Sequence, residues 1–91
     1  MTQHDIVHRN EKQFMISNLG NEIVLMDIQQ GHYINVNPVG SVIWNKLAVP
    51  IMVKDLIHSL VEEYGVSTAQ CEDDTLKFLQ KLQQHHMLNV Q

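Results

Sequence analysis

The chain has 91 residues, of which 44% are hydrophobic, so it has the size of one small domain with a single core. Its 6 lysine and arginine residues are scattered, and its 10 acidic residues leave a formal net charge of -4, which argues against a nucleic-acid-binding protein because such proteins gain affinity by neutralising phosphates. The single cysteine, Cys71, excludes an internal disulfide, and no apolar run approaches the roughly 18 residues of a membrane span, so we expect a cytoplasmic protein without membrane contact.

The first third of the chain predicts a small sheet. Residues 1–12 are polar apart from Ile6 and Val7, so we expect a flexible N-terminal tail there, with a weak extra strand as the alternative, and the folded domain over residues 13–91. The turn-forming dipeptide Gly20-Asn21 and a second turn that ends at Gly31 separate runs of β-forming residues. These runs predict a three-stranded antiparallel meander with strands over residues 14–19, 22–28 and 32–36.

The segment after the third strand predicts a helix with a well-defined start. Asn37 supplies an N-cap side chain, and Pro38 has a fixed φ that suits the first helical position. Apolar residues then recur at helical spacing to about Leu47, and Trp44 belongs to this apolar stripe. We therefore expect Trp44 in the core, directly after the last strand of the sheet.

Two more helices are predicted further along the chain. An apolar stripe indicates a helix from Val53 to Tyr64, which Gly65 ends as a C-terminal cap. Ser67 is a candidate N-cap for a third helix that runs to about His85. The apolar residues expected to close the chain against the core are Met87, Leu88 and Val90. Three antiparallel strands followed by three helices predict a winged-helix-like α+β domain.

The polar residues do not indicate catalysis, a cofactor or a metal site. The pair His85-His86 lies at a predicted helix C-terminus, where cationic or carbonyl-bonding side chains are favoured in any protein. The run Glu72-Asp73-Asp74 lies near the start of the third helix, where the macrodipole favours carboxylates. Since no nucleophile, base and orienting group occur together, we expect a protein that is not an enzyme.

From Gly31 onward the chain carries the pattern G-x-Y-x-x-V-N-x-x-G-x-x-I-W, which resembles the PqqD-like family. Members of this family are the precursor-peptide recognition domains of ribosomal peptide natural-product pathways. The resemblance covers about residues 14–90, because the second strand and the two later helices also look like those of the family. The departures are mild: Val36 stands where leucine is usual, Thr75 where valine is usual, and residues 48–52 lack the common Asp-Gly turn.

The resemblance implies a role without catalysis, in which the domain binds the leader segment of a precursor peptide and presents it to a processing enzyme. The missing Asp-Gly turn and the helix start Val53-Lys-Asp-Leu56 look more like the free-standing recognition proteins of lasso-peptide pathways. The processing enzyme would then be a leader protease. The alternative is PqqD proper, a peptide chaperone for a radical SAM enzyme in PQQ biosynthesis.

The resemblance also implies that the leader lies in a groove between the third strand and the third helix. The terminal strand of a meander leaves one row of backbone groups without partners, so an extended peptide can add to it. Leu76 lies about 120° from the centre of the apolar stripe of the third helix, so we expect it to face this groove. The candidate peptide-binding residues are His32, Tyr33, Ile34, Asn35, Val36, Asp73, Leu76, Lys77 and Gln80.

Two other classes of function stay open. In a DNA-binding winged helix the third helix would enter the major groove, but its exposed positions carry carboxylates, with only Lys77 and Lys81 as cations. In a dimerisation domain the terminal strand would pair with its own copy. We favour a monomer that binds a peptide.

Overall fold

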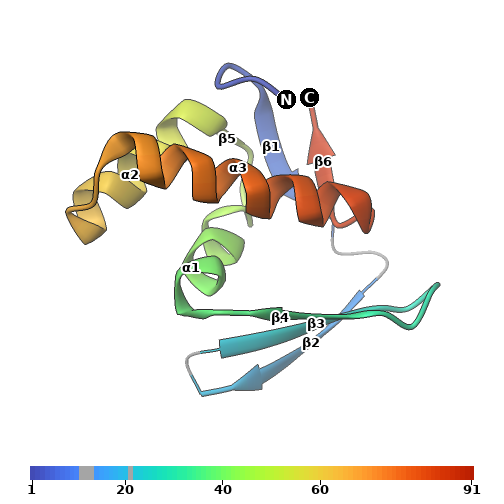
Figure 1. The fold of residues 1–91 in the computed structure, drawn as a ribbon. Coiled ribbons are helices and arrows are strands. Elements are labelled where there is room, and N and C mark those ends of the chain that lie inside the picture. The colour runs from blue at the N-terminus through green and yellow to red at the C-terminus, as the bar shows by residue number, and fades with distance from the viewer. Residues whose placement is uncertain (11–13, 21) are drawn as a thin grey trace.

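The computed structural model describes residues 1–10, 14–20 and 22–91, and over these residues it has an α+β fold with two antiparallel sheets and three helices (Figure 1). One sheet is the predicted meander, in the order β2 (Phe14–Leu19), β3 (Glu22–Asp27) and β4 (Tyr33–Val36). Gly20 and Gly31 have φ values of 71° and 72° at its two turns, a conformation that glycine adopts without strain. The other residue of the first predicted turn, Asn21, lies outside the described residues.

The second sheet was not predicted as a sheet. It has the order β5 (Ile51–Met52), β1 (Ile6–Arg9) and β6 (Leu88–Val90), with antiparallel pairing on both sides of β1. The flexible tail expected over residues 1–12 is therefore wrong for β1, where the alternative of an extra strand is confirmed. The boundary expected between residues 12 and 13 lies outside the described residues.

The residues that form the second sheet differ in burial. Val7 at the centre of β1 is 0% exposed, which explains why this part of the chain is ordered. Met87 and Leu88 are buried as expected. Val90 is 37% exposed, so its assignment to the core was wrong. It is the last residue of β6, an edge strand of the second sheet.

Each of the three helices has the cap that was predicted for it, at the start of α1 and α3 and at the end of α2. In α1 (Pro38–Lys46) the Asn37 Oδ1 accepts a hydrogen bond from the N–H of Gly40 at 2.8 Å. The helix α2 (Val53–Tyr64) ends at Gly65, whose φ of 63° is left-handed. In α3 (Thr68–Gln84) the Ser67 hydroxyl accepts a hydrogen bond from the N–H of Gln70 at 3.2 Å. The two N-caps satisfy backbone donors that have no partner inside a helix, whereas the N–H of Gly65 donates to the carbonyl of Val61 at 2.9 Å.

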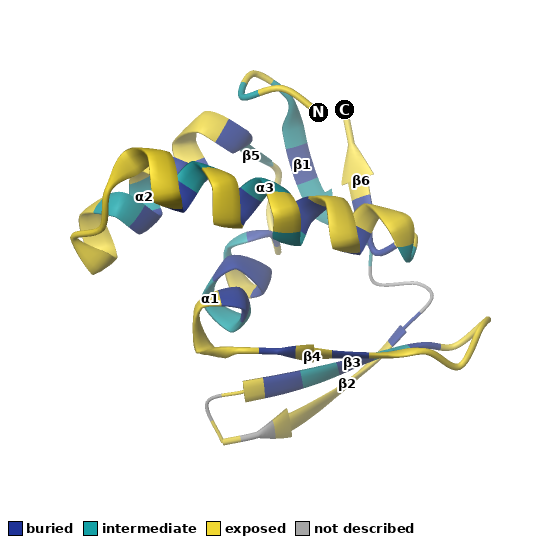
Figure 2. Ribbon diagram, viewed as in Figure 1, coloured by how far each residue is buried: buried dark blue, intermediate teal, exposed yellow. Residues whose placement is uncertain are grey.

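The core lies between the two sheets and the three helices (Figure 2). Trp44 on α1 is 1% exposed, as predicted. Its ring contacts Phe14 of β2 edge to face, at a centroid distance of 4.8 Å, and the Arg9 guanidinium of β1 lies 5.2 Å from its centroid. The indole therefore joins α1 to both sheets.

Candidate functional site

β4 is an edge strand, because within the described residues it pairs with β3 alone. A backbone N–H of β3 donates to the carbonyl of His32 at 2.9 Å, and in an antiparallel ladder the backbone groups alternate in direction from one residue to the next. By this alternation the backbone groups of Ile34 and Val36 point to β3, and those of Tyr33 and Asn35 point to the outer edge. An extended chain that lies along this edge can hydrogen-bond to both of the latter residues.

The side chains of β4 also divide into two groups. Ile34 and Val36 are 2% and 3% exposed and belong to the core, while Tyr33 is 69% exposed and Asn35 is exposed on the other face of the sheet. Ile34 and Val36 were candidate peptide-binding residues, and the structure gives them a different role. Their side chains are buried and their backbone groups face β3, so they hold β4 in place.

α3 forms the wall opposite the end of β4. A cavity of about 390 Å³ opens between the start of α1, which directly follows β4, and α3. Asn37, Val39 and Gly40 line it on one side, and Asp74, Lys77 and Phe78 line it on the α3 side. We call this cavity the groove; no residue of β4 itself lines it, and peptide binding between β4 and α3 stays a prediction.

Gly40 lets α1 approach β4 closely enough to shape this cavity. A Cβ atom at Gly40 would lie 2.6 Å from Cγ1 of Val36 and 3.5 Å from Cε1 of Phe78. The first distance is too short for two carbon atoms, so any larger residue would have to push β4 and α1 apart. Gly40 is the second glycine of the sequence pattern that begins at Gly31, and its role is this close packing.

At the other end of β4, a histidine next to the strand contacts a histidine at the end of α3. The rings of His32, just before β4, and His85, the C-cap of α3, lie edge to face with centroids 6.0 Å apart. His32 is exposed and His85 is partly exposed. The C-terminal end of α3 therefore lies close to the start of β4.

Three of the candidate residues on α3 lie away from this groove. At 3.6 residues per turn, Leu76 and Gln80 each lie about 160° around the helix from Phe78, and Asp73 lies about 140° from it. Leu76 is partly buried and packs against the core, so it is not the spare apolar side chain that we expected. Gln80 and Asp73 are exposed on the outer side of α3.

Lys77 is the candidate on α3 that does line the groove. Its ammonium group lies 2.9 Å from a carboxylate oxygen of Asp73, one helical turn earlier. The hydrogen bond to Asp73, and then the charge of that carboxylate, raise the pKa of Lys77 above its ordinary value. Lys77 is therefore a charged, exposed side chain with a carboxylate beside it.

Sequence reasoning missed Phe78, Asp74 and Val39 as site residues. Phe78 and Val39 were assigned to apolar stripes and hence to the core, but Phe78 is only partly buried and Val39 is 44% exposed. Asp74 was assigned to favourable placement near a helix start. For the residues on α3 the signal is their spacing, because Lys77 and Phe78 lie three and four residues after Asp74 and share one flank of the helix.

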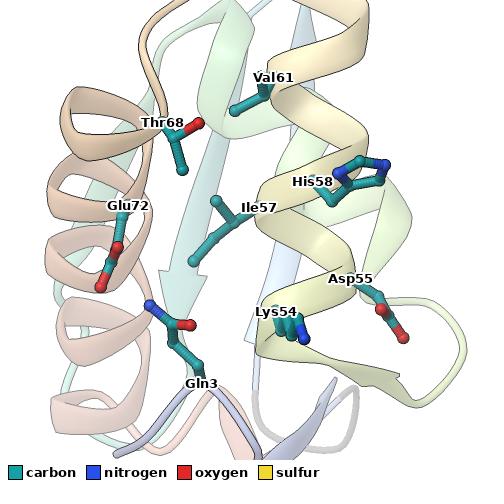
Figure 3. A pocket seen from close by; sticks show the side chains of 8 residues that line it. All are labelled: Gln3, Lys54, Asp55, Ile57, His58, Val61, Thr68 and Glu72. Carbon is teal, nitrogen blue, oxygen red and sulfur yellow. The ribbon is translucent and has the colours of Figure 1, made fainter.

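A second depression lies on the opposite side of α3, facing α2 and the N-terminal segment (Figure 3). It has a volume of about 400 Å³, with Ile57 and Val61 as its apolar part and Gln3 and Glu72 on the other side. None of the residues that line it also lines the groove, so the two cavities are separate.

Metal-binding and membrane-spanning features are absent from the part of the chain that the structure describes. Residues 1–10, 14–20 and 22–91 contain no group of three or more histidine, cysteine or acidic side chains that could hold a metal ion. Over the same residues no helix is both long and apolar enough to cross a membrane.

Comparisons with known proteins agree with the resemblance in the sequence. Residues 22–88 match the family described as Coenzyme PQQ synthesis protein D (PqqD). A solved structure described as TbiB1 in complex with the TbiA(beta) leader peptide has a TM-score of 0.77 and 26% sequence identity to this chain, over 90% of this chain and 94% of that chain. None of the curated proteins compared with the chain matches it. Because the matched segment runs from the start of β3 to the start of β6 and includes both walls of the groove, the protein belongs to the PqqD family.

Proposed function

We propose that this protein is a non-catalytic leader-peptide-binding protein. It captures a ribosomally made precursor peptide by β-strand addition along β4 and presents it to a processing enzyme. The observation that carries this proposal is the outer edge of β4, which offers the backbone groups of Tyr33 and Asn35 beside a cavity lined by α3. The similarity to TbiB1, whose solved structure is a complex with a leader peptide, supports it.

The bound peptide gains affinity from two sources. Its backbone pairs with the outward N–H and C=O groups of β4, which is independent of peptide sequence. Its side chains on the inner face of the extended sheet enter the cavity against Phe78 and Val39, and this burial gives selectivity. Lys77 and Asp74 both line the groove and have opposite charges, so charge neutralisation contributes little.

The partner that we favour is the leader protease of a lasso-peptide pathway. The support is in the sequence: residues 48–52 lack an Asp-Gly turn, and α2 begins with Val53-Lys-Asp-Leu56. The alternative partner is a radical SAM enzyme of PQQ biosynthesis, the pathway for which the family is named. Co-purification of the tagged protein with the enzymes encoded beside it, in the presence of the precursor, distinguishes the two.

Proline substitutions on the two edges of the same sheet test strand addition. Asn35→Pro removes an outward N–H from β4 and places a ring in the path of an added strand. By the same alternation Asn18 on β2 also points its N–H outward, so Asn18→Pro is a matched control on the opposite edge. Both residues are exposed asparagines in edge strands. Ile34→Pro, by contrast, breaks the ladder to β3 and should unfold the sheet.

The assay is fluorescence anisotropy with a labelled leader peptide of the precursor encoded beside this protein, after circular dichroism has shown which variants are folded. We expect Asn35→Pro to weaken binding by at least about tenfold, since it loses one hydrogen bond of about 1 kcal/mol and adds a steric clash. Asn18→Pro should bind as the parent does. Equal affinities of folded Asn35→Pro and Asn18→Pro would show that the peptide does not add to β4.

A further inference from the structure

Another cavity, different from the depression between α2 and α3, adjoins the groove beside α1. It has a volume of about 240 Å³ and lies where α1, α2 and α3 meet. Its buried part includes Leu60 and Cys71, which are 1% and 7% exposed. Its rim is formed by large apolar side chains that are far more exposed: Val39 at 44%, Tyr64 at 42% and Val66 at 45%. We call this cavity the helix-junction pocket.

The helix-junction pocket is continuous with the groove beside β4. Val39, Ile43 and Asp74 line both cavities. The groove cavity in turn includes Asn37, the residue directly after β4. A chain that leaves the outer edge of β4 in the direction of Asn37 therefore passes over Val39 at the start of α1 and reaches this pocket.

The polar groups at the rim already satisfy one another. Both carboxylate oxygens of Asp74 accept hydrogen bonds from the Gln70 side-chain amide, each at 3.0 Å. In the buried part, the Sγ of Cys71 lies 3.8 Å from the Oγ1 of Thr75. The surface left for a ligand is mainly apolar, and the nearest charge is the negative one of Asp74. Such a pocket favours an uncharged, apolar side chain and disfavours an acidic one.

We infer that the helix-junction pocket binds one large apolar side chain of the same peptide that adds to β4. This inference rests on the proposed function and extends it by a second recognition element outside the strand. The exposed rim of Val39, Tyr64 and Val66 then becomes buried when the peptide binds. Clusters of exposed apolar side chains around a cavity are typical of binding surfaces.

The fold also gives the place of that side chain in the peptide. Phe78 in the groove and Cys71 in the pocket are separated by about 10 Å along α3, which an extended chain covers in about three residues. The other strand pairs in this sheet are antiparallel, and an added strand antiparallel to β4 has its N-terminal end toward Asn37. The apolar residue should therefore lie about three positions before the residue that contacts Phe78.

The test is a selection from a displayed library of random peptides, on the parent protein and on two variants. Val66→Glu puts a carboxylate on the rim of the pocket. Val49→Glu is the matched control, because Val49 is also an exposed valine between two helices, 64% exposed, and lies outside both cavities. We expect peptides selected on the parent and on Val49→Glu to share an apolar residue at a fixed distance before the strand-adding segment, and peptides selected on Val66→Glu to lack it.

Titration of one selected peptide then measures the contact. Replacing its apolar residue by alanine should weaken binding to the parent and to Val49→Glu by about tenfold or more, and should change binding to Val66→Glu by less than about twofold. The same loss in all three proteins overturns the inference. Dimerisation of the parent protein through this rim would also overturn it, because a second copy would then occupy the pocket. Size-exclusion chromatography would show this as an elution volume that depends on concentration in the parent and in Val49→Glu but not in Val66→Glu.

The proposed function and this inference fail in different ways. If Asn35→Pro abolishes binding while Val66→Glu binds as the parent does, strand addition stands and the helix-junction pocket is not used. If Asn35→Pro binds selected peptides as the parent does, or if no peptide is selected on the parent, the proposed function fails and the inference fails with it.

Discussion

Replacing Trp44 by alanine tests how the two sheets are held together. The indole is 1% exposed, contacts Phe14 of β2 and lies under the Arg9 guanidinium of β1. Its removal therefore leaves a cavity between α1 and both sheets. The position of α1 also shapes the groove beside β4, because Gly40 on the same helix lines the groove.

The expected cost follows from these contacts. Truncation of a buried tryptophan to alanine costs about 3 to 5 kcal/mol, and this range includes the lost burial and the cavity that remains. The edge-to-face contact with Phe14 accounts for about 0.5 to 1.5 kcal/mol, and the Arg9 contact for up to about 1 kcal/mol. A domain of this size has a total stability of about 5 to 15 kcal/mol, so Trp44→Ala should leave it marginal or unfolded.

Trp44→Phe is the matched control. The indole Nε1 is buried without a hydrogen-bond partner in the part of the chain that is described, so a phenyl ring loses packing but no hydrogen bond. We expect it to cost about 1 to 2 kcal/mol, less than half the cost of alanine. Urea unfolding followed by circular dichroism measures both variants without relying on the tryptophan itself. A loss below about 1 kcal/mol in Trp44→Ala would refute the view that this side chain joins the sheets.

Two further predictions concern the groove. Gly40→Ala adds a Cβ that would lie 2.6 Å from Cγ1 of Val36. We therefore expect the free energy of unfolding, measured with urea, to fall by about 1 to 2 kcal/mol and leader binding to weaken, although alanine favours helix formation. A variant more stable than the parent would contradict this. Leader binding should change by less than about threefold between about 0.1 M and 1 M salt, because backbone pairing and apolar burial dominate it. A steep, linear fall of log affinity with log salt in the same anisotropy assay would instead indicate charge neutralisation.

Local signals in the sequence were sufficient to predict the helices and the meander. Asn37 and Ser67 both act as N-caps, and Gly65 adopts the left-handed conformation that ends α2. Each of these roles depends on hydrogen bonds or dihedral angles within a few residues, which a single sequence displays directly. The antiparallel order of β2, β3 and β4 follows because the turns between them are short.

The second sheet could not be predicted because its partners are far apart in sequence. β1 pairs with Ile51–Met52 on one side and with Leu88–Val90 on the other, and these segments are only two and three residues long. A run of two residues has no measurable alternation of apolar and polar positions. The buried position of Val7 becomes evident only when all three segments are brought together.

The sequence identified the terminal strand of the meander, but it predicted only part of the α3 surface that lines the groove. A terminal strand is visible from the order of elements, so β4 was identified, but which of its residues face outward depends on the register with β3. On α3, the angle of Leu76 from the apolar stripe gave no information on which flank faces β4. The core extends to that side of the helix, and Phe78 on the other flank lines the groove.

The charge distribution on α3 distinguishes peptide binding from the DNA-binding alternative. A recognition helix in the major groove needs cations that are available to phosphates. Here Lys77 is already paired with Asp73 at 2.9 Å, and Asp74 lies on the same flank as Lys77. Phosphates brought to this flank would meet a carboxylate at the position where they need a cation. A leader peptide that approaches with backbone dipoles and apolar side chains meets no such repulsion, so the surface beside β4 fits a neutral extended chain better than a nucleic acid.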